Sequence, residues 1–198
     1  MRKLIVCNIV SLDGYYSGPG GDVMVMPFDQ GFSEYNAERL RAADTLLLGR
    51  TSFEGFVSYW PQIADDPNRD PVDREISRLN NAIEKVVVSD TLTSDAATAA
   101  WPTTRVIGRA DAHKEIAALK EGPGREILMF GSHTLWNDLL AHGLVDELHL
   151  MIGAGVLGEG VRAFESRPPG SLRLVDTHRW DGSNLLLTRY AVEPATAT

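Results

Sequence analysis

The chain has 198 residues, of which 43% are hydrophobic and 23% charged, a composition typical of globular proteins rather than disordered or collagen-like ones. Its net charge of −8, from 27 acidic and 19 basic residues, lacks the basic surplus that non-specific nucleic-acid binding requires, so we expect no nucleic-acid partner. No apolar run approaches the roughly 20 residues of a membrane span, so we also expect no membrane partner.

The N-terminal stretch and the cysteine content bear on cellular location. Asn8 and Asp13 interrupt the apolar residues near the N-terminus, and no small-residue cleavage site follows, so we expect a mature cytoplasmic protein. The single cysteine, Cys7, permits no internal disulfide, and its apolar neighbours favour a buried, inert thiol. Because the five histidines share no metal-ligand spacing, we expect no metal site.

Apolar runs of strand length alternate with helical stretches in the first half of the chain. A buried strand is expected near residues 4–10, followed after the Asp13-Gly14 turn by a long Gly- and Pro-rich loop over 14–31. Ser33 is the expected N-cap of a helix that runs to about residue 43. The elements expected next are a strand at 45–48, a helix at 49–60, a polar loop at 61–73, a helix near 72–80 and a strand at 86–88.

The second half continues the alternation and then changes character. Strands are expected at 105–107, 127–130 and 148–152, with helices at 112–120 and 131–143 between them. Runs at 172–175 and 185–190 bracket the turn pair Asp181-Gly182, which is typical of a hairpin.

This order of elements predicts an α/β fold with three layers. A mixed, mostly parallel sheet lies between helices on both faces, and the C-terminal antiparallel hairpin extends one edge. We expect a single domain over residues 1–192 and a frayed tail over 193–198, because the sequence contains no internal repeat and no low-complexity linker.

The expected strand ends carry similar residue types. In open α/β sheets, ligands bind beyond the carboxyl ends of the strands. Three such ends lead into Gly49-Arg50-Thr51-Ser52, Ser89-Asp90 and Gly131-Ser132-His133-Thr134. Glycine and hydroxyl side chains at a helix start offer free N–H groups and a positive helix end, which suit a pyrophosphate, and Arg50 can pair with a further phosphate.

Each of these turns, taken alone, is more often only a helix cap or a plain turn than a phosphate site. Their occurrence at successive strand ends favours a dinucleotide site. No G-x-G-x-x-G pattern is present, so a standard Rossmann site is not supported.

Several segments, in this order and spacing, resemble the dihydrofolate-reductase-like superfamily. They are Ser11–Gly14, Leu47–Glu54, Lys85–Ser89, Phe130–Ser132, Gly143–Leu148 and Val156–Gly160. The branch they resemble is related to the C-terminal reductase domain of bacterial riboflavin biosynthesis proteins, and the resemblance covers about residues 3–192.

The resemblance implies a dihydrofolate-reductase-like fold that binds NADPH. The positions that it assigns to the cofactor are Gly49, Arg50, Thr51, Ser52, Ser89, Gly131, Ser132, His133, Thr134 and Leu135. It also implies a cis peptide bond at Phe130–Gly131 and a homodimer formed through the C-terminal strands.

On the substrate side, the expected lining residues are Asn8, Asp13, Tyr59 and Trp60. Asp13 is the first candidate to orient the substrate or relay a proton, and turn capping is its alternative role. Glu34 is the second candidate, as a proton donor early in the first helix, and its alternative is a solvated helix-start acid. Asn8 stands where the riboflavin enzymes usually carry a lysine, so the identity of the substrate stays open.

Three functions compete at this point. The first is an NADPH-dependent reductase that moves hydride to a small polar heterocycle, pyrimidine- or pteridine-like, as a 5-amino-6-(5-phosphoribosylamino)uracil reductase does. The second is a nucleotide- or small-ligand-binding protein that keeps the fold without turnover. The third is a structural or interaction module, which the acidic balance permits but does not favour.

Overall fold

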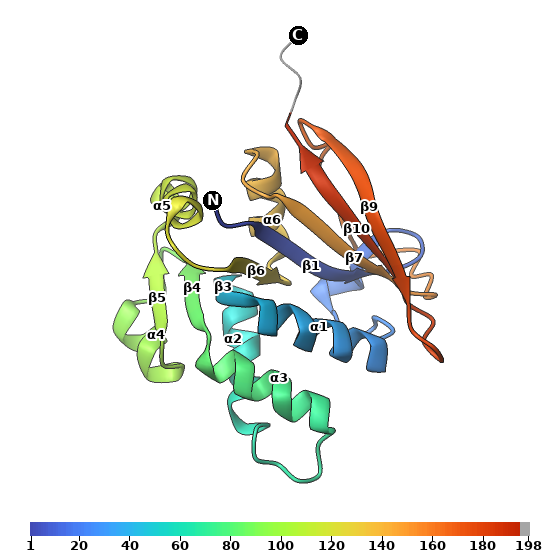
Figure 1. The fold of residues 1–198 in the computed structure, drawn as a ribbon, viewed down its shortest axis with the longest axis horizontal. Helices are drawn as coiled ribbons and strands as arrows, with labels where there is room; N and C mark the ends of the chain where they lie inside the picture. Colours follow the sequence, from blue (N-terminus) through green and yellow to red (C-terminus); the bar gives the residue numbers. More distant parts are fainter. Residues whose placement is uncertain (195–198) are drawn as a thin grey trace.

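A sheet of eight strands forms the middle layer of the protein (Figure 1). The computed structural model describes residues 1–194. The strand order is β5-β4-β3-β6-β1-β7-β10-β9. The strands are β1 (Leu4–Val10), β3 (Ala43–Gly49), β4 (Glu84–Val88), β5 (Thr104–Ile107), β6 (Glu126–Phe130), β7 (Glu147–Ile152), β9 (Ser171–Arg179) and β10 (Leu186–Glu193).

The pairing of these strands confirms the predicted sheet. The pairs from β5 across to β7 are parallel, whereas β10 pairs antiparallel with both β7 and β9. The C-terminal hairpin therefore extends one edge, as the Asp181-Gly182 turn predicts. Glu193 is the last residue of β10, and residues 195–198 of the expected tail lie outside the described part of the chain.

Helices cover both faces of the sheet, and this explains why the inner strands are mostly apolar. The helices are α1 (Gln30–Ala42), α2 (Arg50–Tyr59), α3 (Pro71–Ala82), α4 (Ser94–Ala100), α5 (Ala112–Glu121) and α6 (His133–Ala141). All seven residues of β1 are buried, because successive side chains point to opposite, covered faces. None of the helices in residues 1–194 is long and apolar enough to cross a membrane.

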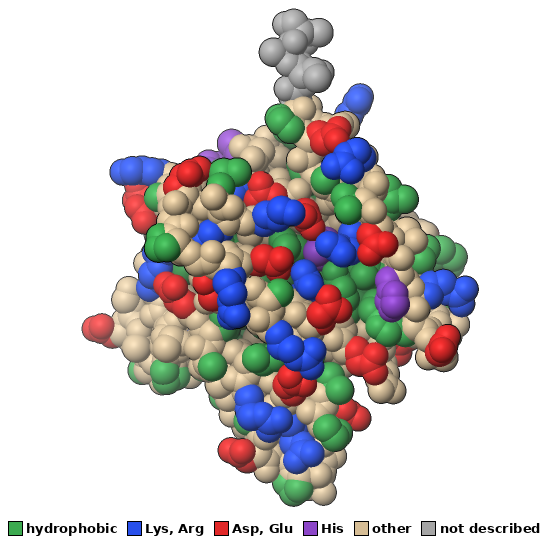
Figure 2. All heavy atoms as spheres, viewed as in Figure 1, with side chains coloured by type: hydrophobic (Ala, Val, Ile, Leu, Met, Phe, Trp, Pro, Cys, Tyr) green, Lys and Arg blue, Asp and Glu red, His purple; other side chains and the backbone are tan. Residues whose placement is uncertain are grey.

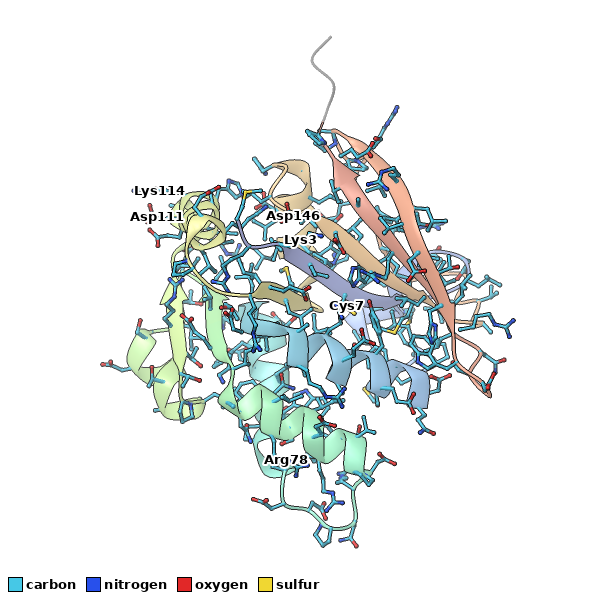
Figure 3. All side chains as sticks on the ribbon, in the orientation of Figure 1. Lys3, Cys7, Arg78, Asp111, Lys114 and Asp146 are labelled. Carbon is cyan, nitrogen blue, oxygen red and sulfur yellow. The ribbon has the colours of Figure 1, made fainter. Side chains whose placement is uncertain are left out.

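Two hydrophobic cores lie between the sheet and its helices, one on each face of the sheet. Ile5 and Cys7 belong to the core that packs under α1 to α4, together with Trp101. Leu4 and Val6 belong to the core under α5 and α6, together with Trp136. Cys7 is a buried free thiol, and burial raises its pKa to about 12, which agrees with the predicted inert role (Figure 3).

The helix starts differ in how they are capped. Asp29, not the predicted Ser33, caps α1: its carboxylate accepts a hydrogen bond from the Phe32 N–H, and the helix begins four residues earlier than expected, at Gln30. Asp70 and Thr93 cap α3 and α4 in the same way. In contrast, neither α2 nor α6 has a side-chain cap.

Two short strands and one short α-helix were not predicted from the sequence. Part of the expected loop at 14–31 is β2 (Tyr15–Ser17), which pairs antiparallel with β8 (Val161–Arg162) to form a separate two-stranded sheet. The third is α4, whose alanine-rich sequence carries little apolar periodicity. The antiparallel pairing of β2 with β8 brings two loops that are distant in sequence together beside the carboxyl end of β1.

Candidate functional site

The turns that follow β3 and β6 are joined directly to each other. These strands are parallel neighbours, so their carboxyl ends lie at the same edge of the sheet. The N–H of Gly49 donates to Ser132 Oγ at 2.9 Å, and the N–H of Ser132 donates to Ser52 Oγ at 2.8 Å. We call residues 49–52 and 131–135, held by these two bonds, the helix-start junction. Most of the residues predicted to bind the cofactor thus lie together.

Asn8 holds the second turn of the junction from the neighbouring strand β1. Its Oδ1 accepts a hydrogen bond from the Gly131 N–H at 2.7 Å, and its Nδ2 lies 3.5 Å from the Gly131 carbonyl oxygen. The side chain is buried, so both of its polar ends face protein. Asn8, which the sequence predicted to lie on the substrate side, therefore fixes the position of the Gly131 backbone.

The backbone of this turn corrects one prediction. No peptide bond in residues 1–194 is cis, so the bond expected at Phe130–Gly131 is trans. Instead, two successive left-handed residues reverse the chain, Gly131 with φ +58° and Ser132 with φ +54°. Glycine takes this conformation without strain, whereas serine has a steric cost.

The first turns of α2 and α6 leave backbone N–H groups free at the junction. The first N–H groups of a helix have no partner within it. Across the described residues, no side chain or carbonyl accepts from the first-turn amides, which are those of Arg50, Thr51, Ser52, His133, Thr134 and Leu135. Two positive helix ends therefore meet at one place, an arrangement that favours an anionic group between them.

Arg50 extends the junction toward the turn after β4. Its guanidinium donates to Thr91 Oγ1 at 2.6 Å and to Glu54 Oε1 at 2.7 Å, and about half of the side chain is exposed. Ser89 is buried there, and its hydroxyl accepts from the N–H groups of Thr91 and Leu92. The Ser89 hydroxyl thus shapes the turn, while Arg50 offers a charge to solvent.

His133 ties the start of α6 to the small sheet. Its Nε2 lies 2.7 Å from the Arg162 carbonyl oxygen, its Nδ1 lies 3.3 Å from a Glu165 carboxylate oxygen, and its ring is 5.0 Å from that of Tyr16. Thr134 is exposed, and the Cβ of Leu135 lies 3.9 Å from where a Cβ would stand on Gly49. The three residues therefore face different surroundings although they are adjacent in sequence.

Asp13 anchors a loop from the far end of the chain. Its carboxylate accepts hydrogen bonds from Ser11 Oγ at 2.7 Å, from the Leu157 N–H at 3.1 Å and from the Gly158 N–H at 2.8 Å. These donors, the Ser11 hydroxyl first, lower the pKa of Asp13 to about 2. A carboxylate in this setting is ionised at neutral pH and organises the loop; its part in proton relay stays a prediction.

Three other predicted residues lie away from the junction. Glu34 is exposed on α1 and accepts a hydrogen bond from Gln30. Tyr59 and Trp60 lie at the far end of α2, about 15 Å along the helix from Gly49 at 1.5 Å per residue. The structure does not bring these three side chains together with the turns that carry the free N–H groups.

Tyr16 is a candidate that the sequence analysis did not identify. A Cβ on Gly131 would lie 3.3 Å from the Tyr16 hydroxyl, which places this hydroxyl at the junction. Burial raises the pKa of Tyr16 to about 12, so the hydroxyl is a neutral hydrogen-bond donor. No local signal marks it, because its position depends on the pairing of β2 with β8.

The sequence matches a family model and a bacterial relative over most of its length. The family model described as RibD C-terminal domain matches residues 2–187. The chain is 32% identical over 180 residues to the uncharacterized protein YyaP of Bacillus subtilis (strain 168), which covers 89% of this chain and 88% of YyaP.

Solved structures share the fold at low sequence identity. A putative riboflavin biosynthesis protein from Shewanella sp. PV-4 matches with a TM-score of 0.61 and 20% identity, covering 97% of this chain and 99% of that one. RibD of Acinetobacter baumannii matches with a TM-score of 0.65 and 17% identity, covering 98% of this chain and 58% of that one.

A third match extends the likeness to a folate enzyme. Dihydrofolate reductase from Enterococcus faecalis, complexed with NADP(H) and RAB-propyl, gives a TM-score of 0.60 at 14% identity, covering 96% of each chain. The three-layer fold and the resemblance stated from the sequence are thereby confirmed. The chain belongs to the RibD C-terminal domain family.

Proposed function

We propose that this protein is an NADPH-dependent reductase that acts on a small polar heterocycle, pyrimidine- or pteridine-like. The observation that carries the proposal is the helix-start junction, where two uncapped helix ends are locked together by the Gly49–Ser132 and Ser132–Ser52 hydrogen bonds. Membership of the RibD C-terminal domain family supports it, together with the fold shared with dihydrofolate reductase. The proposed reaction is similar to that of the 5-amino-6-(5-phosphoribosylamino)uracil reductases.

The residues at the junction fit such a cofactor. Free N–H groups at the starts of α2 and α6 match the oxygens of a pyrophosphate, and Arg50 with Thr91 matches a phosphate farther along the edge. When bound, the nicotinamide supplies the hydride. The chain itself contributes binding, orientation and exclusion of water, which are the tasks that a cofactor enzyme leaves to the protein.

The Gly131 turn is suited to orientation. Asn8 fixes its backbone from β1, and Ser52 fixes it from α2, so the turn is held from both sides. Close approach is possible because Gly131 has no side chain, and the neutral Tyr16 hydroxyl beside it can donate a hydrogen bond to a bound molecule. We assign Tyr16 a positioning role toward cofactor or substrate.

The charge of the substrate side favours a substrate without phosphate. No lysine or arginine occurs between Lys3 and Arg39, the segment that carries both Asn8 and Asp13. Arg162, which pairs with this segment, donates to the Asp13 carbonyl oxygen and lies 4.2 Å over the Tyr15 ring. A phosphorylated substrate needs a cation that is free to pair with it. We therefore expect the unphosphorylated heterocycle to be the better substrate.

Binding without turnover is the second candidate, and one observation favours it. The two carboxylates predicted to supply protons are occupied elsewhere, Asp13 by loop N–H groups and Glu34 by Gln30 on an exposed helix face. A reductase built on this site would take its proton from solvent or through Tyr16. Absence of NADPH oxidation with any pteridine or pyrimidine, despite tight NADPH binding, would support this candidate.

A thermal-shift titration with NADPH tests the binding half of the proposal. At 100 times its Kd, a ligand that binds only the folded state adds about 2.7 kcal/mol, or about 5–10 °C in Tm for a protein of this size. The variant Arg50→Gln should reduce the shift with NADPH more than the shift with NADH. Arg41→Gln is a matched control, because Arg41 is also an exposed arginine in an ion pair, with Glu75 on α3. If neither NADPH nor NADH raised the Tm of the wild-type protein, the proposed cofactor would be refuted.

We also propose that two copies associate through the C-terminal hairpin. Strand β9 lies at the edge of the sheet and is exposed along nearly its whole length, with Leu174 and Val175 about half exposed. On the face shown in Figure 2, hydrophobic side chains lie among the mixed charges near this hairpin. Leu174→Glu should convert a dimer to a monomer in light scattering, whereas Val156→Glu, an exposed site elsewhere, should not.

A further inference from the structure

We propose that the surface between α5 and α6 holds a divalent metal site for a cation of the zinc class. Its ligands are His113 on α5 with Asp138 and His142 from α6. One ligand atom from each side chain lies within 4.8 Å of the others. The sequence gives no hint of this site, because the two histidines lie in separate helical segments and only the packing of those helices joins them.

The spacing on α6 aligns two of the ligands. Asp138 and His142 are four residues apart, so they occupy neighbouring positions on one face of the helix. His113 completes the set from α5: its Nε2 lies 2.6 Å from Asp138 Oδ2, and its ring centroid lies 4.0 Å from that of His142. Ligands of one zinc ion stand about 3.3 Å apart, since each lies about 2.0 Å from the metal, so small side-chain rotations suffice.

The donor set selects the class of metal. Two imidazole nitrogens and one carboxylate oxygen suit zinc and similar transition metals, whereas calcium and magnesium prefer oxygen ligands alone. The three side chains are between 43% and 53% exposed, so an ion can reach them and water can complete its coordination. The negative end of the α6 dipole lies at His142 and favours a cation there.

Hydrogen bonds join the three side chains in this structure. Asp138 is shared by both histidines, through His113 Nε2 and through His142 Nδ1, which lies 3.3 Å from the carboxylate and 2.8 Å from the Asp138 carbonyl oxygen. A bound cation would take the place of these hydrogen bonds, because the same nitrogen and oxygen atoms would become its ligands. In Figure 3, Lys114 on α5 and Asp111, which precedes α5, lie on the side of α5 away from α6.

The site is separate from the helix-start junction. His133 begins α6 at the junction, and His142 follows the last residue of the same helix. A metal here would cross-link α5 to α6 and leave the proposed cofactor contacts untouched. The inference therefore stands or falls independently of the proposed reductase activity.

Calorimetric titration of the full, untagged chain with zinc chloride tests the inference. We expect one zinc ion per chain, and His113→Ala, Asp138→Asn and His142→Ala should each weaken binding by at least about tenfold, the lower end of the losses seen for outer-shell partners of metal sites. His178→Ala is the matched control, because His178 is an exposed histidine on β9. Magnesium chloride should give no saturable binding.

Cobalt provides a second readout that a loss of folding cannot imitate. Wild-type protein with cobalt(II) should show visible absorption from nitrogen-ligated metal, and this absorption should be absent from His113→Ala while circular dichroism is unchanged. Zinc binding that is absent from the wild type, or that survives in His113→Ala and Asp138→Asn alike, would overturn the proposed site.

Discussion

Ser132 combines a strained backbone with a structural hydrogen bond, and its replacement separates the two effects. Its hydroxyl accepts the Gly49 N–H at 2.9 Å, and its φ of +54° lies in the left-handed region. Ser132→Ala removes the bond and keeps the strain, whereas Ser132→Gly removes both. Any difference between the two variants therefore reports the backbone conformation.

The magnitudes follow from the two contributions. A hydrogen bond of this kind contributes about 1 kcal/mol net, so Ser132→Ala should lower Tm by about 2–4 °C. Left-handed backbone costs a residue with a side chain about 1 kcal/mol relative to glycine. Ser132→Gly should consequently unfold close to the wild type and about 1 kcal/mol above Ser132→Ala.

Urea unfolding followed by circular dichroism measures both differences. Ser58→Ala is the control for loss of a hydroxyl, since the Ser58 hydroxyl is exposed and bonds only to the Gly55 carbonyl oxygen within α2. A Ser132→Ala protein as stable as the wild type would show that the bond between the two turns contributes nothing. A Ser132→Gly protein less stable than Ser132→Ala would refute the left-handed conformation.

Three further predictions concern the buried polar groups and the junction. His149 is fully buried, and burial lowers its pKa from 6.5 to about 4. Between these pH values the unfolded chain binds a proton that the folded chain does not, so the free energy of unfolding should fall as the pH drops from about 6.5 to about 4. His149→Gln should flatten this pH dependence in pH-jump or equilibrium unfolding. Lys85 is buried, and its ammonium donates to the carbonyl oxygens of Asn80 and Ile83. Lys85→Met should cost about 1–3 kcal/mol in urea unfolding, because it removes these bonds and leaves the Asn80 carbonyl oxygen without this donor, although Ile83 keeps a bond from Thr103. The exposed Arg105→Met should cost little. Gly131→Ala should reduce the NADPH thermal shift, because the added Cβ would stand 3.1 Å from Ser52 Oγ at a positive φ, and an unchanged shift would place the cofactor elsewhere.

The local pattern of the chain was sufficient for the layers and for part of the site. Alternate residues of β1 enter opposite cores, as a strand covered on both faces requires. Glycine and serine after two apolar runs indicated helix starts, and parallel strands necessarily end at a common edge, so residues 49–52 and 131–135 could be grouped from the sequence. These inferences succeed because periodicity and turn chemistry act over a few residues.

Only the tertiary structure decided which polar groups meet. Asp13 lies against Leu157 and Gly158, and Tyr16 reaches Gly131, through the pairing of β2 with β8, which no local signal encodes. The Phe130–Gly131 turn uses left-handed residues rather than a cis bond, and His113 meets His142 only because α5 packs beside α6. Such contacts depend on strand register and on packing between segments that are far apart in the chain. The hydrogen bonds and ion pairs that result cannot be predicted from the spacing of residues along the sequence.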